Sequence, residues 1–555
     1  MLLYYLITFP FVLFAAVRTY NLIKNYIDAR KYGLPIILLP VSFEDVWWMI
    51  IRPLFAWVER LPLGLGDWYV YTEMGWPTVD GDRTTKRLGE NFVLCSPYSN
   101  HIITCYPAGA ETIYRNHSKW HFPPAQSQIF AFYGQNVSST TGADWQRHRK
   151  ITTAAFNEHF MQEVWSESTK KAALLNLAEE RDRKLDRIRS TFDVLAMNVL
   201  AVVGFGQERL LNTATPGHKQ SLMECLGFIL QHILLTAIFN SLKVPDFLLP
   251  GVLQRLKRSV AEFKLYMEEL VLHQMKQPSS ASKTEGSPPT LLEAMVNANE
   301  AEKQQLQKTA GRPSYLTESE LYGNLFVFNL AGYETTASTM TFALSFLATN
   351  TEVQSWIAEE INRYYTSQNG EKRGYAYAYP KLVRCMALMY ETLRLASPAP
   401  LLVRAPSSPQ ELPIILPNGE ERIVTVNPGT LVGGHFYGGH LSPRWGPDAH
   451  VFNPKRFISK STVTGEEELV TPPDTLFIPW LTGPRVCPGK KFSQVEFVAI
   501  VAQIFSEYRV HVLPENNESE ADARARFEGV VGQKYFNVST HLKKPVEGAV
   551  RFVQR

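Results

Sequence analysis

Residues 480–489 read WLTGPRVCPG, and this stretch decides the interpretation of the whole sequence. It places Cys487 in a loop rich in glycine and proline, directly before an apolar-periodic helix expected from about Pro488 to Tyr508. A helix N-terminus and nearby basic side chains stabilise a thiolate, and Gly483 and Gly489 let the backbone approach a flat ligand. We expect a thiolate ligand here, although a lone cysteine before a helix is more often inert.

The composition indicates a folded protein with a large core. The chain has 555 residues, of which 45% are hydrophobic and 20% charged. Its net charge of 56 − 53 = +3 gives no preference for nucleic acid, which we do not expect as a partner. The five cysteines are scattered, odd in number and never in C-x-x-C spacing. This pattern argues against a disulfide framework or a structural zinc site and favours a reduced, cytosol-facing chain.

The N-terminus begins with an apolar run, residues 1–17, with basic residues only after it. A cleaved signal peptide carries its positive charge before the apolar stretch, so we predict a retained transmembrane anchor over residues 1–23 and a cytosolic body. Residues 24–60 are expected to form a linker with a membrane-interfacial stretch, residues 46–58, which contains three tryptophans. Core packing is the alternative interpretation of that stretch.

The rest of the chain predicts a mainly α fold with a smaller β region. Short strand-like runs with turn residues occupy about 66–107, helical periodicity dominates 143–397, and strand-like runs return at 413–416 and 422–426. Residues 277–289 are rich in serine, proline and lysine and are expected to be a flexible insertion.

One predicted helix is long enough to cross the whole domain. Residues 317–320 read TESE, a capping-box start, and apolar residues continue through Phe346 without proline, giving about 30 residues. Near its middle, residues 331–336 read AGYETT. A buried carboxylate at Glu334 would be unfavourable unless it is paired or functional. Local capping by Glu334 and a bond from Thr335 to its i−4 carbonyl are the alternative to a functional role.

Together these two segments resemble the cytochromes P450. Residues 480–489 are similar to the haem-binding pattern F-x-x-G-x-R-x-C-x-G, with Trp480 in place of phenylalanine. The resemblance implies the P450 fold and a haem b cofactor. It further implies that Cys487 is the axial iron ligand, that Arg485 pairs with a haem propionate and that Trp480 shields the sulfur.

Residues 331–336 are similar to the P450 distal-helix pattern (A/G)-G-x-(D/E)-T-(T/S) at every fixed position. On this resemblance Gly332 leaves space for dioxygen, and Glu334 and Thr335 deliver protons during oxygen activation. Tyr333 falls at the variable position.

Three further segments follow in the family's order. Glu391 and Arg394 resemble the E-x-x-R motif, and Arg456 in FNPKRF, residues 452–457, resembles the third member of the same buried ion triad. The resemblance gives this triad a structural role.

Trp145 and Arg149 resemble the W-x-x-x-R element of an early helix, which directs both side chains towards a propionate. Arg404 occupies the place of another propionate ligand. A solvated surface position is the alternative for either arginine.

The matches cover nearly the whole chain beyond the anchor, so we expect residues 61–555 to be one haem domain. No dinucleotide fingerprint or P-loop is present in the sequence. A monooxygenase of this kind would take electrons from a separate NADPH–cytochrome P450 reductase. Basic residues near the thiolate loop could dock it, or could simply keep that surface soluble: Arg147, Arg149, Lys150, Lys490 and Lys491.

The expected function is a haem-thiolate monooxygenase of the fungal microsomal type, which inserts one oxygen atom from O2 into a hydrophobic small molecule. Apolar and aromatic candidate pocket walls at 122–132, 326–330 and 398–402 favour a terpenoid or polyketide substrate from secondary metabolism. The expected location is the endoplasmic reticulum membrane, with a single pass. The alternatives are a P450-fold isomerase or dehydratase and a membrane-tethered haem-binding sensor.

Overall fold

The computed structural model describes residues 2–123, 127–175, 177, 183–206, 213–233, 235, 236, 245, 247, 249–276, 289–308, 314–473, 475–515 and 517–555. The expected insertion at 277–289 therefore lies outside the described residues except for its last position.

Helices make up most of the described chain. The longer ones are α1 (Leu2–Arg30), α5 (Pro107–Arg115), α7 (Gly142–Thr152), α8 (Glu158–Ala173), α9 (Leu185–Phe205), α10 (Leu222–Gln231), α12 (Gly251–Lys276), α13 (Leu291–Lys308), α14 (Glu318–Thr349), α15 (Thr351–Tyr364), α17 (Val383–Leu395), α19 (Lys490–Glu507) and α20 (Glu520–Gly532). Short helices are α2 (Val46–Ile51), α3 (Pro77–Asp80), α4 (Arg83–Leu88), α16 (Tyr375–Ala378) and α18 (Phe436–His440).

The strands form one large sheet and several small ones. The six-stranded sheet has the order β1 (Ile36–Leu38), β2 (Asn91–Cys95), β3 (Asn100–Thr104), β9 (Thr430–His435), β6 (Leu401–Pro406) and β4 (Trp120–His121). The smaller sheets are β12 (Tyr508–Val512) with β15 (Ala549–Gln554) and β5 (Arg183–Lys184), β7 (Gln410–Ile415) with β8 (Glu421–Val426), β10 (Ile458–Lys460) with β11 (Glu467–Leu469), and β13 (Lys534–Phe536) with β14 (Thr540–Leu542).

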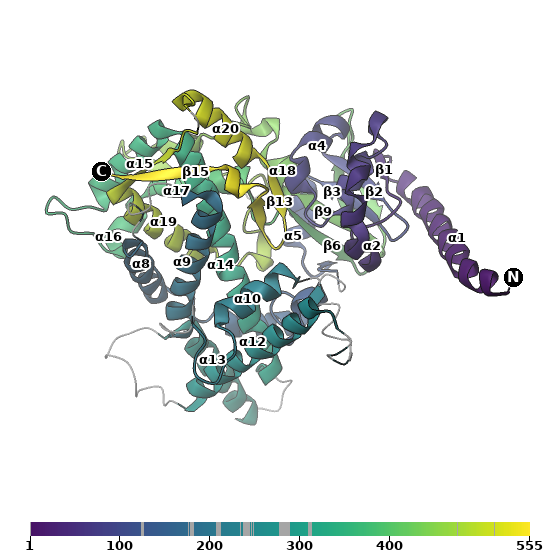
Figure 1. The fold of residues 1–555 in the computed structure, drawn as a ribbon, viewed down its shortest axis with the longest axis horizontal. Helices are drawn as coiled ribbons and strands as arrows, with labels where there is room; N and C mark the ends of the chain where they lie inside the picture. Colours follow the sequence, from purple (N-terminus) through teal and green to yellow (C-terminus); the bar gives the residue numbers. More distant parts are fainter. Residues whose placement is uncertain are drawn as a thin grey trace.

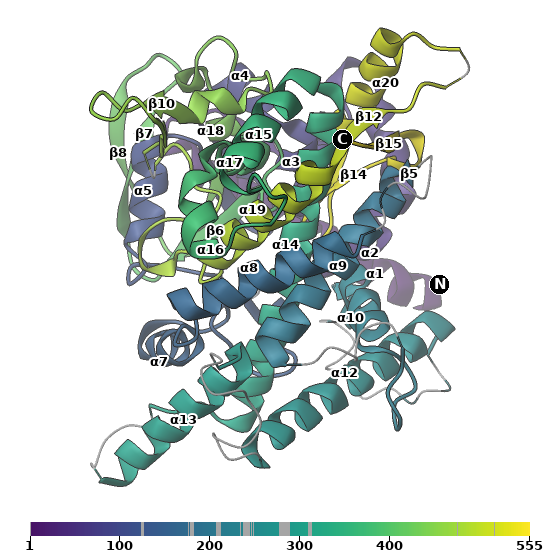
Figure 2. The ribbon, with the colours of Figure 1, turned by 90° about the vertical axis from the view of Figure 1, so that its left-hand side faces the viewer.

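The large sheet and the helices occupy different sides of the molecule. Figure 1 shows the strands of the six-stranded sheet on one side, the helices α8, α9 and α19 on the other, and α1 projecting beyond the sheet. In the turned view, α10, α12 and α13 lie together below α8 and α9 (Figure 2). This mainly α architecture with a smaller β region is the one expected from the sequence.

The long helix α14 runs through the centre of the core. Thr317 and Glu320 form the expected capping box at its start, and the helix continues for 32 residues. It packs along α9, and a Cβ on Gly332 would lie 2.9 Å from Cδ2 of Leu200. Gly332 therefore permits close packing of these two helices; a further role in leaving space for dioxygen stays a prediction.

The N-terminal region differs from the expected anchor and linker. The helix α1 continues past residue 23, where Asn25 donates a hydrogen bond of 2.8 Å to the carbonyl oxygen of Ser96, and Ala29 is fully buried. Strand β1 pairs in parallel with β2 within the main sheet. Residues 24–60 are therefore built into the folded body, because β1 and the end of α1 bury apolar side chains against the sheet.

The tryptophans of the expected interfacial stretch divide between two environments. Trp48 is buried and packs beside Phe55 and Trp68, whereas Trp47 and Trp57 are exposed. Core packing therefore holds for Trp48, and membrane contact of Trp47 and Trp57 stays a prediction. The predicted strand at 68–71 is instead a short 3-10 helix, Asp67–Thr72.

Among the described residues, one helix meets the length and hydropathy of a membrane span: α9, whose apolar window is 61% buried. Its burial makes it a core helix. Side chains of α1 are described from Thr8 onwards, and those of Phe9, Phe11 and Val12 are exposed.

Candidate active site

Cys487 lies between the 3-10 helix Gly483–Arg485 and the start of α19. Its backbone N–H donates to the carbonyl oxygen of Trp480 over 2.8 Å, which closes the loop. The side chain of Cys487 is exposed, whereas the other four cysteines are buried. Surrounding protein atoms nevertheless raise the pKa of the thiol, and the Gly489 backbone N–H, Arg149 and Lys490 act in the opposite direction. The thiol is thus enclosed on several sides but still has an open face.

The glycine before this loop serves a packing role. Gly483 has a φ of +73°, and a Cβ there would lie 2.9 Å from Cα of Arg115 in α5. Leu481, two residues earlier, also has a positive φ of 62°. Gly483 therefore lets the loop approach α5; the structure does not assign it to the approach of a ligand, which was the sequence expectation.

Trp480 fixes the loop from the other side. Its indole Nε1 donates to Oγ of Ser493 on α19 over 3.1 Å, and the Lys490 ammonium lies 5.5 Å from a ring centroid. The loop is therefore tied to the helix that follows it. Shielding of the sulfur by Trp480 stays a prediction.

The central part of α14 has one opening. Between residues 320 and 345 every described residue is buried except Ala331, which is exposed, and Gly332 and Thr335, which are partly exposed. The Thr335 hydroxyl donates to the Ala331 carbonyl oxygen over 2.9 Å. The threonine bonds to its i−4 carbonyl, as the alternative interpretation states, but it does so at the one place where the helix is open.

Arg404 is a buried guanidinium that has no counterion within the part of the chain that the structure describes. It is 4% exposed, and its Nη1 donates to the carbonyl oxygen of Val403 over 2.9 Å. Tyr114 and Phe122 lie beside the guanidinium, with ring centroids 5.2 and 5.4 Å from Cζ. Burial lowers the pKa of Arg404, and no carboxylate within the described ranges pairs with it. Burying an unpaired charge is costly, so the position requires a negative partner.

The guanidiniums of Arg485 and Arg149 lie in the same region as that of Arg404. Arg485 donates to the Thr140 carbonyl oxygen over 2.6 Å and lies 4.8 Å from the ring centroid of Trp145. Burial lowers the pKa of Arg485 to about 10, with further lowering by Arg404 and Arg149. Burial likewise lowers the pKa of Arg149, while Cys487 raises it. The structure therefore brings the three predicted arginines and Trp145 together around the thiol.

Sequence reasoning missed His121 of β4. Its Nδ1 atom is buried and, in the described part of the chain, has no hydrogen-bond partner. Burial lowers the pKa of His121, and Arg485 and His117 lower it further. The neutral imidazole beside Arg485 can donate one more hydrogen bond to a negative group. The sequence holds no local motif around this histidine, because strand pairing with β6 alone positions it.

The expected ion triad is assembled. Arg394 makes two bonds to Glu391, 2.7 and 2.8 Å long, with both residues fully buried, and Nε of Arg456 donates to Glu391 over 3.2 Å. Arg456 also pairs with Asp448 over 2.9 Å, a partner that the sequence analysis did not include. The guanidinium of Arg394 also donates to the carbonyl oxygen of His440 over 2.8 Å. These bonds join α17 to the segment before the thiolate loop.

The carboxylate of Glu334 contacts three other side chains. Its Oε1 lies 2.9 Å from Arg189 Nη2 on α9 and 3.0 Å from His541 Nε2 on β14, and it accepts a 2.8 Å bond from Ser539 Oγ. Burial alone would raise the pKa of Glu334, but Arg189 and His541 outweigh it and lower the pKa to about 2. Glu334 is therefore an ionised carboxylate at neutral pH.

The expected basic docking residues do not all face solvent. Arg147 pairs with Glu320 at the start of α14, and Lys150 pairs with Glu302. Arg149 belongs to the buried guanidinium group. Lys491 pairs with Glu158 over 4.0 Å, so four of the five residues have an ion-pair partner or are buried, although the side chains of Lys150 and Lys491 stay 66% and 44% exposed.

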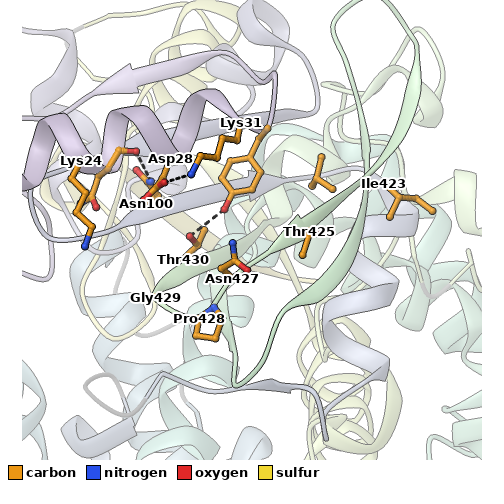
Figure 3. A pocket seen from close by; sticks show the side chains of 13 residues that line it. Lys24, Asp28, Lys31, Asn100, Ile423, Thr425, Asn427, Pro428, Gly429 and Thr430 are labelled. Atoms are coloured by element: carbon orange, nitrogen blue, oxygen red, sulfur yellow. Dashed lines mark hydrogen bonds and ion pairs between the residues drawn. The ribbon is translucent and has the colours of Figure 1, made fainter.

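A separate polar cavity of about 540 Å³ lies at the end of α1 (Figure 3). Its lining includes Lys24, Asp28, Asn100 and Thr430, and Lys31 pairs with Asp28 over 2.5 Å. It shares no lining residue with the thiolate loop or α14.

The sequence profile of the family described as Cytochrome P450 matches residues 82–536. The chain belongs to the cytochrome P450 family. Curated relatives are named monooxygenases, and the chain is an oxidoreductase of this class. A haem iron with cysteine thiolate ligation, dioxygen, an electron-transfer partner and a small-molecule substrate follow from membership of the family.

Several similar sequences come from fungi. The chain is 24% identical to the phomenoic acid biosynthesis cluster cytochrome P450 monooxygenase of Leptosphaeria maculans, over 98% of both chains. It is 28% identical to cytochrome P450 monooxygenase 124 of Postia placenta, over 91% of this chain and 92% of the relative. Among solved structures, retinoic acid bound cyanobacterial CYP120A1 superposes with a TM-score of 0.64 at 17% identity, covering 94% of this chain and 100% of the other. This likeness shows the P450 fold.

The residues present fit a haem. Three guanidiniums with lowered pKa values and without carboxylate partners among the described residues surround an open thiol. The two propionates of a haem would supply the missing negative charge, and charge-assisted bonds from guanidinium to carboxylate are strong. The donor set therefore matches the cofactor that the family implies.

Proposed function

We propose that this protein is a haem-thiolate monooxygenase that inserts one oxygen atom from O2 into a hydrophobic small molecule. The observation that carries the proposal is the group Arg149, Arg404 and Arg485, which has no carboxylate partner among the described residues and adjoins the open Cys487 thiol through Arg149. Haem b, held by these residues, supplies the oxygen activation. The Cys487 thiolate would hold its iron.

The surrounding side chains bind and orient this group. Arg485, Arg404 and Arg149 would hold the propionates, and the ring of Trp145 packs on the guanidinium of Arg485. Trp480 ties the thiolate loop to α19. Glu391, Arg394 and Arg456 keep the segment before the loop in place and take no part in the chemistry.

The chain's own role in oxygen activation lies on α14. Thr335 is the hydroxyl at the opening of the helix, and its Oγ1 can hold a proton or water there. Glu334 is the adjacent carboxylate in the proton path. Gly332 contributes room at the same turn.

A hydrophobic secondary metabolite of terpenoid or polyketide type is the proposed substrate. Phe326 and Leu330 on α14 are apolar and buried, and Leu402 on β6 is partly exposed. The similarity to a monooxygenase of a fungal biosynthesis cluster supports a role in secondary metabolism.

The proposed location is the endoplasmic reticulum membrane, with the haem domain in the cytosol. The exposed apolar side chains of α1 up to about Ile23 support a single membrane pass. The proposed haem domain, residues 61–555, is extended by β1 and the end of α1, which pack on it.

NADPH–cytochrome P450 reductase is the proposed electron donor. Lys150 and Lys491 remain largely exposed and can contribute to its docking.

Reconstitution with the reductase tests the function. The full-length protein, loaded with haem, should consume NADPH and O2 in the presence of the correct substrate and form a product heavier by one oxygen atom. Product formation without O2 and NADPH would favour the isomerase or dehydratase. Haem binding without turnover of any candidate precursor would favour the sensor.

A further inference from the structure

A buried group of charged side chains joins three elements next to Thr335. Arg189 and Asp193 come from α9, Glu334 from α14, and His541 from β14. Arg189 bridges the two carboxylates, with Nε 2.9 Å from Asp193 Oδ1 and Nη2 2.9 Å from Glu334 Oε1. His541 contacts the same Glu334 oxygen over 3.0 Å.

The charged side chains of this group are neutral in sum only if one additional proton is bound. Two carboxylates face one guanidinium, so a neutral His541 leaves a net charge of −1 in a buried place, which is unfavourable. Burial raises the pKa of Asp193 to about 6, although Arg189 opposes the rise. Glu334 stays ionised because Arg189 and His541 stabilise its charge. The extra proton therefore resides on His541 or Asp193.

The group also reaches from the partly exposed His541 to the buried carboxylate of Glu334. The His541 side chain is 20% exposed, while Glu334 is 9% exposed and precedes Thr335 in the helix. The ring of Tyr535 on β13 stacks on the imidazole at 5.3 Å, which leaves the ring edge free to exchange protons. Tyr333, the other titratable residue nearby, has a pKa raised far above the neutral range by burial.

We infer that His541 is the proton-uptake residue of this enzyme and passes protons through Glu334 towards Thr335. The protonated ring releases its Nε2 proton to Oε1 of Glu334. Glu334 then passes that proton on, and the ring takes up a new proton from solvent. Imidazole suits this step because its charge changes near neutral pH. The inference rests on the proposed function and extends it to a residue far away in the sequence.

The variant His541→Gln tests the relay. A glutamine amide keeps a hydrogen-bond donor for Glu334 but carries no exchangeable charge. With reductase and a substrate, product formed per NADPH should fall about threefold or more at pH 7 and lose its pH dependence, with a larger solvent isotope effect. The comparison variant Ser539→Ala removes a donor to the same Glu334 oxygen but keeps the imidazole, so it should retain the pH dependence and the isotope effect of the parent whatever its yield.

A second measurement needs no turnover. Infrared titration of the haem-loaded protein follows the carboxylic acid band of Asp193, identified by its loss in Asp193→Asn. Because a protonated His541 lowers the pKa of Asp193, His541→Gln should move this midpoint to higher pH, whereas Ser539→Ala should not. His541→Asn provides the same test if His541→Gln does not fold.

An unmoved Asp193 midpoint, or a pH profile and isotope effect of His541→Gln equal to those of Ser539→Ala, would overturn the inference. Failure of the proposed function is recognised separately, because the parent itself would then form no oxygenated product with reductase, NADPH and O2, while the infrared titration would still report on the charge group.

Discussion

Thr336 of α14 donates a hydrogen bond of 3.1 Å to Oε2 of Glu496 on α19, the helix that follows the thiolate loop. Both side chains are buried, and burial raises the pKa of Glu496 to about 8, against the lowering by Thr336. Glu496 is therefore a neutral acid at pH 7 that joins the two helices of the site.

Glu496→Gln should change how stability depends on pH. The folded protein holds this proton up to about pH 8, whereas an unfolded glutamate loses it near the ordinary value of 4.5. The stability from Glu496 is thus complete below pH 4.5 and is lost as pH rises through 8. At pH 8.5 the variant should be more stable than the parent by ~1–3 kcal/mol, with little difference at pH 5. Urea midpoints at the two pH values measure this; an unchanged pH slope would contradict it.

Cys487→Ala should abolish the red-shifted Soret band of the reduced, carbon monoxide-bound protein. Cys487 has the one exposed thiol among the five cysteines. Cys105→Ala is the control, because burial raises the pKa of Cys105 well out of range for a thiolate. A band that survives in Cys487→Ala would show that another residue is the ligand.

Thr335→Ala should lower the product formed per NADPH oxidised by about threefold or more, with hydrogen peroxide released instead. The hydroxyl lies at the opening of α14, so substrate affinity and the haem spectrum should change little. Thr341→Ala removes a comparable i−4 bond from a buried part of the same helix and is the control. Equal coupling in the two variants would remove the assigned role of Thr335 and favour the isomerase.

Arg404→Leu should speed the loss of haem about tenfold, measured as transfer to apomyoglobin, because a propionate loses a charge-assisted bond. The haem-free protein should not lose stability to the same degree, since the buried charge lacks a carboxylate partner among the described residues. Arg363→Leu, at a position 64% exposed, is the control. Unchanged transfer would place the propionates elsewhere.

Removal of residues 1–17 should shift the protein towards the soluble fraction and leave the haem spectrum intact. Removal of residues 1–29 should also reduce stability, because it deletes the Asn25 bond to Ser96 and the buried Ala29. Fractionation and thermal inactivation of the two truncated proteins measure this. Equal stability would mean that the end of α1 contributes nothing to the fold.

Short sequence patterns predicted the elements whose ends are set by neighbouring residues. The capping box at Thr317 sets the start of α14, and the glycines and proline around Cys487 set the loop before α19. The sequence predicted Arg149, Arg404 and Arg485 as propionate ligands because each lies in a short segment that resembles the family.

The sequence did not predict contacts between residues that are far apart in the chain. His121, Glu496 and His541 each acquire their role from an element more than a hundred residues away, and no periodicity reports such a contact. The pairing of β1 with β2 was missed for the same reason, because it depends on tertiary packing.

The parallel pairing of β3 with β9 has a consequence for synthesis in the cell. Asn100 is in register with Thr430, so the inner strands of the main sheet are 330 residues apart in the chain. At about 5–20 residues per second, β3 leaves the ribosome roughly 15–65 s before its neighbour exists. During that time its edge is unpaired and apolar, which is the condition for aggregation. The nascent chain therefore depends on chaperones, and slower translation should lower the yield of folded protein.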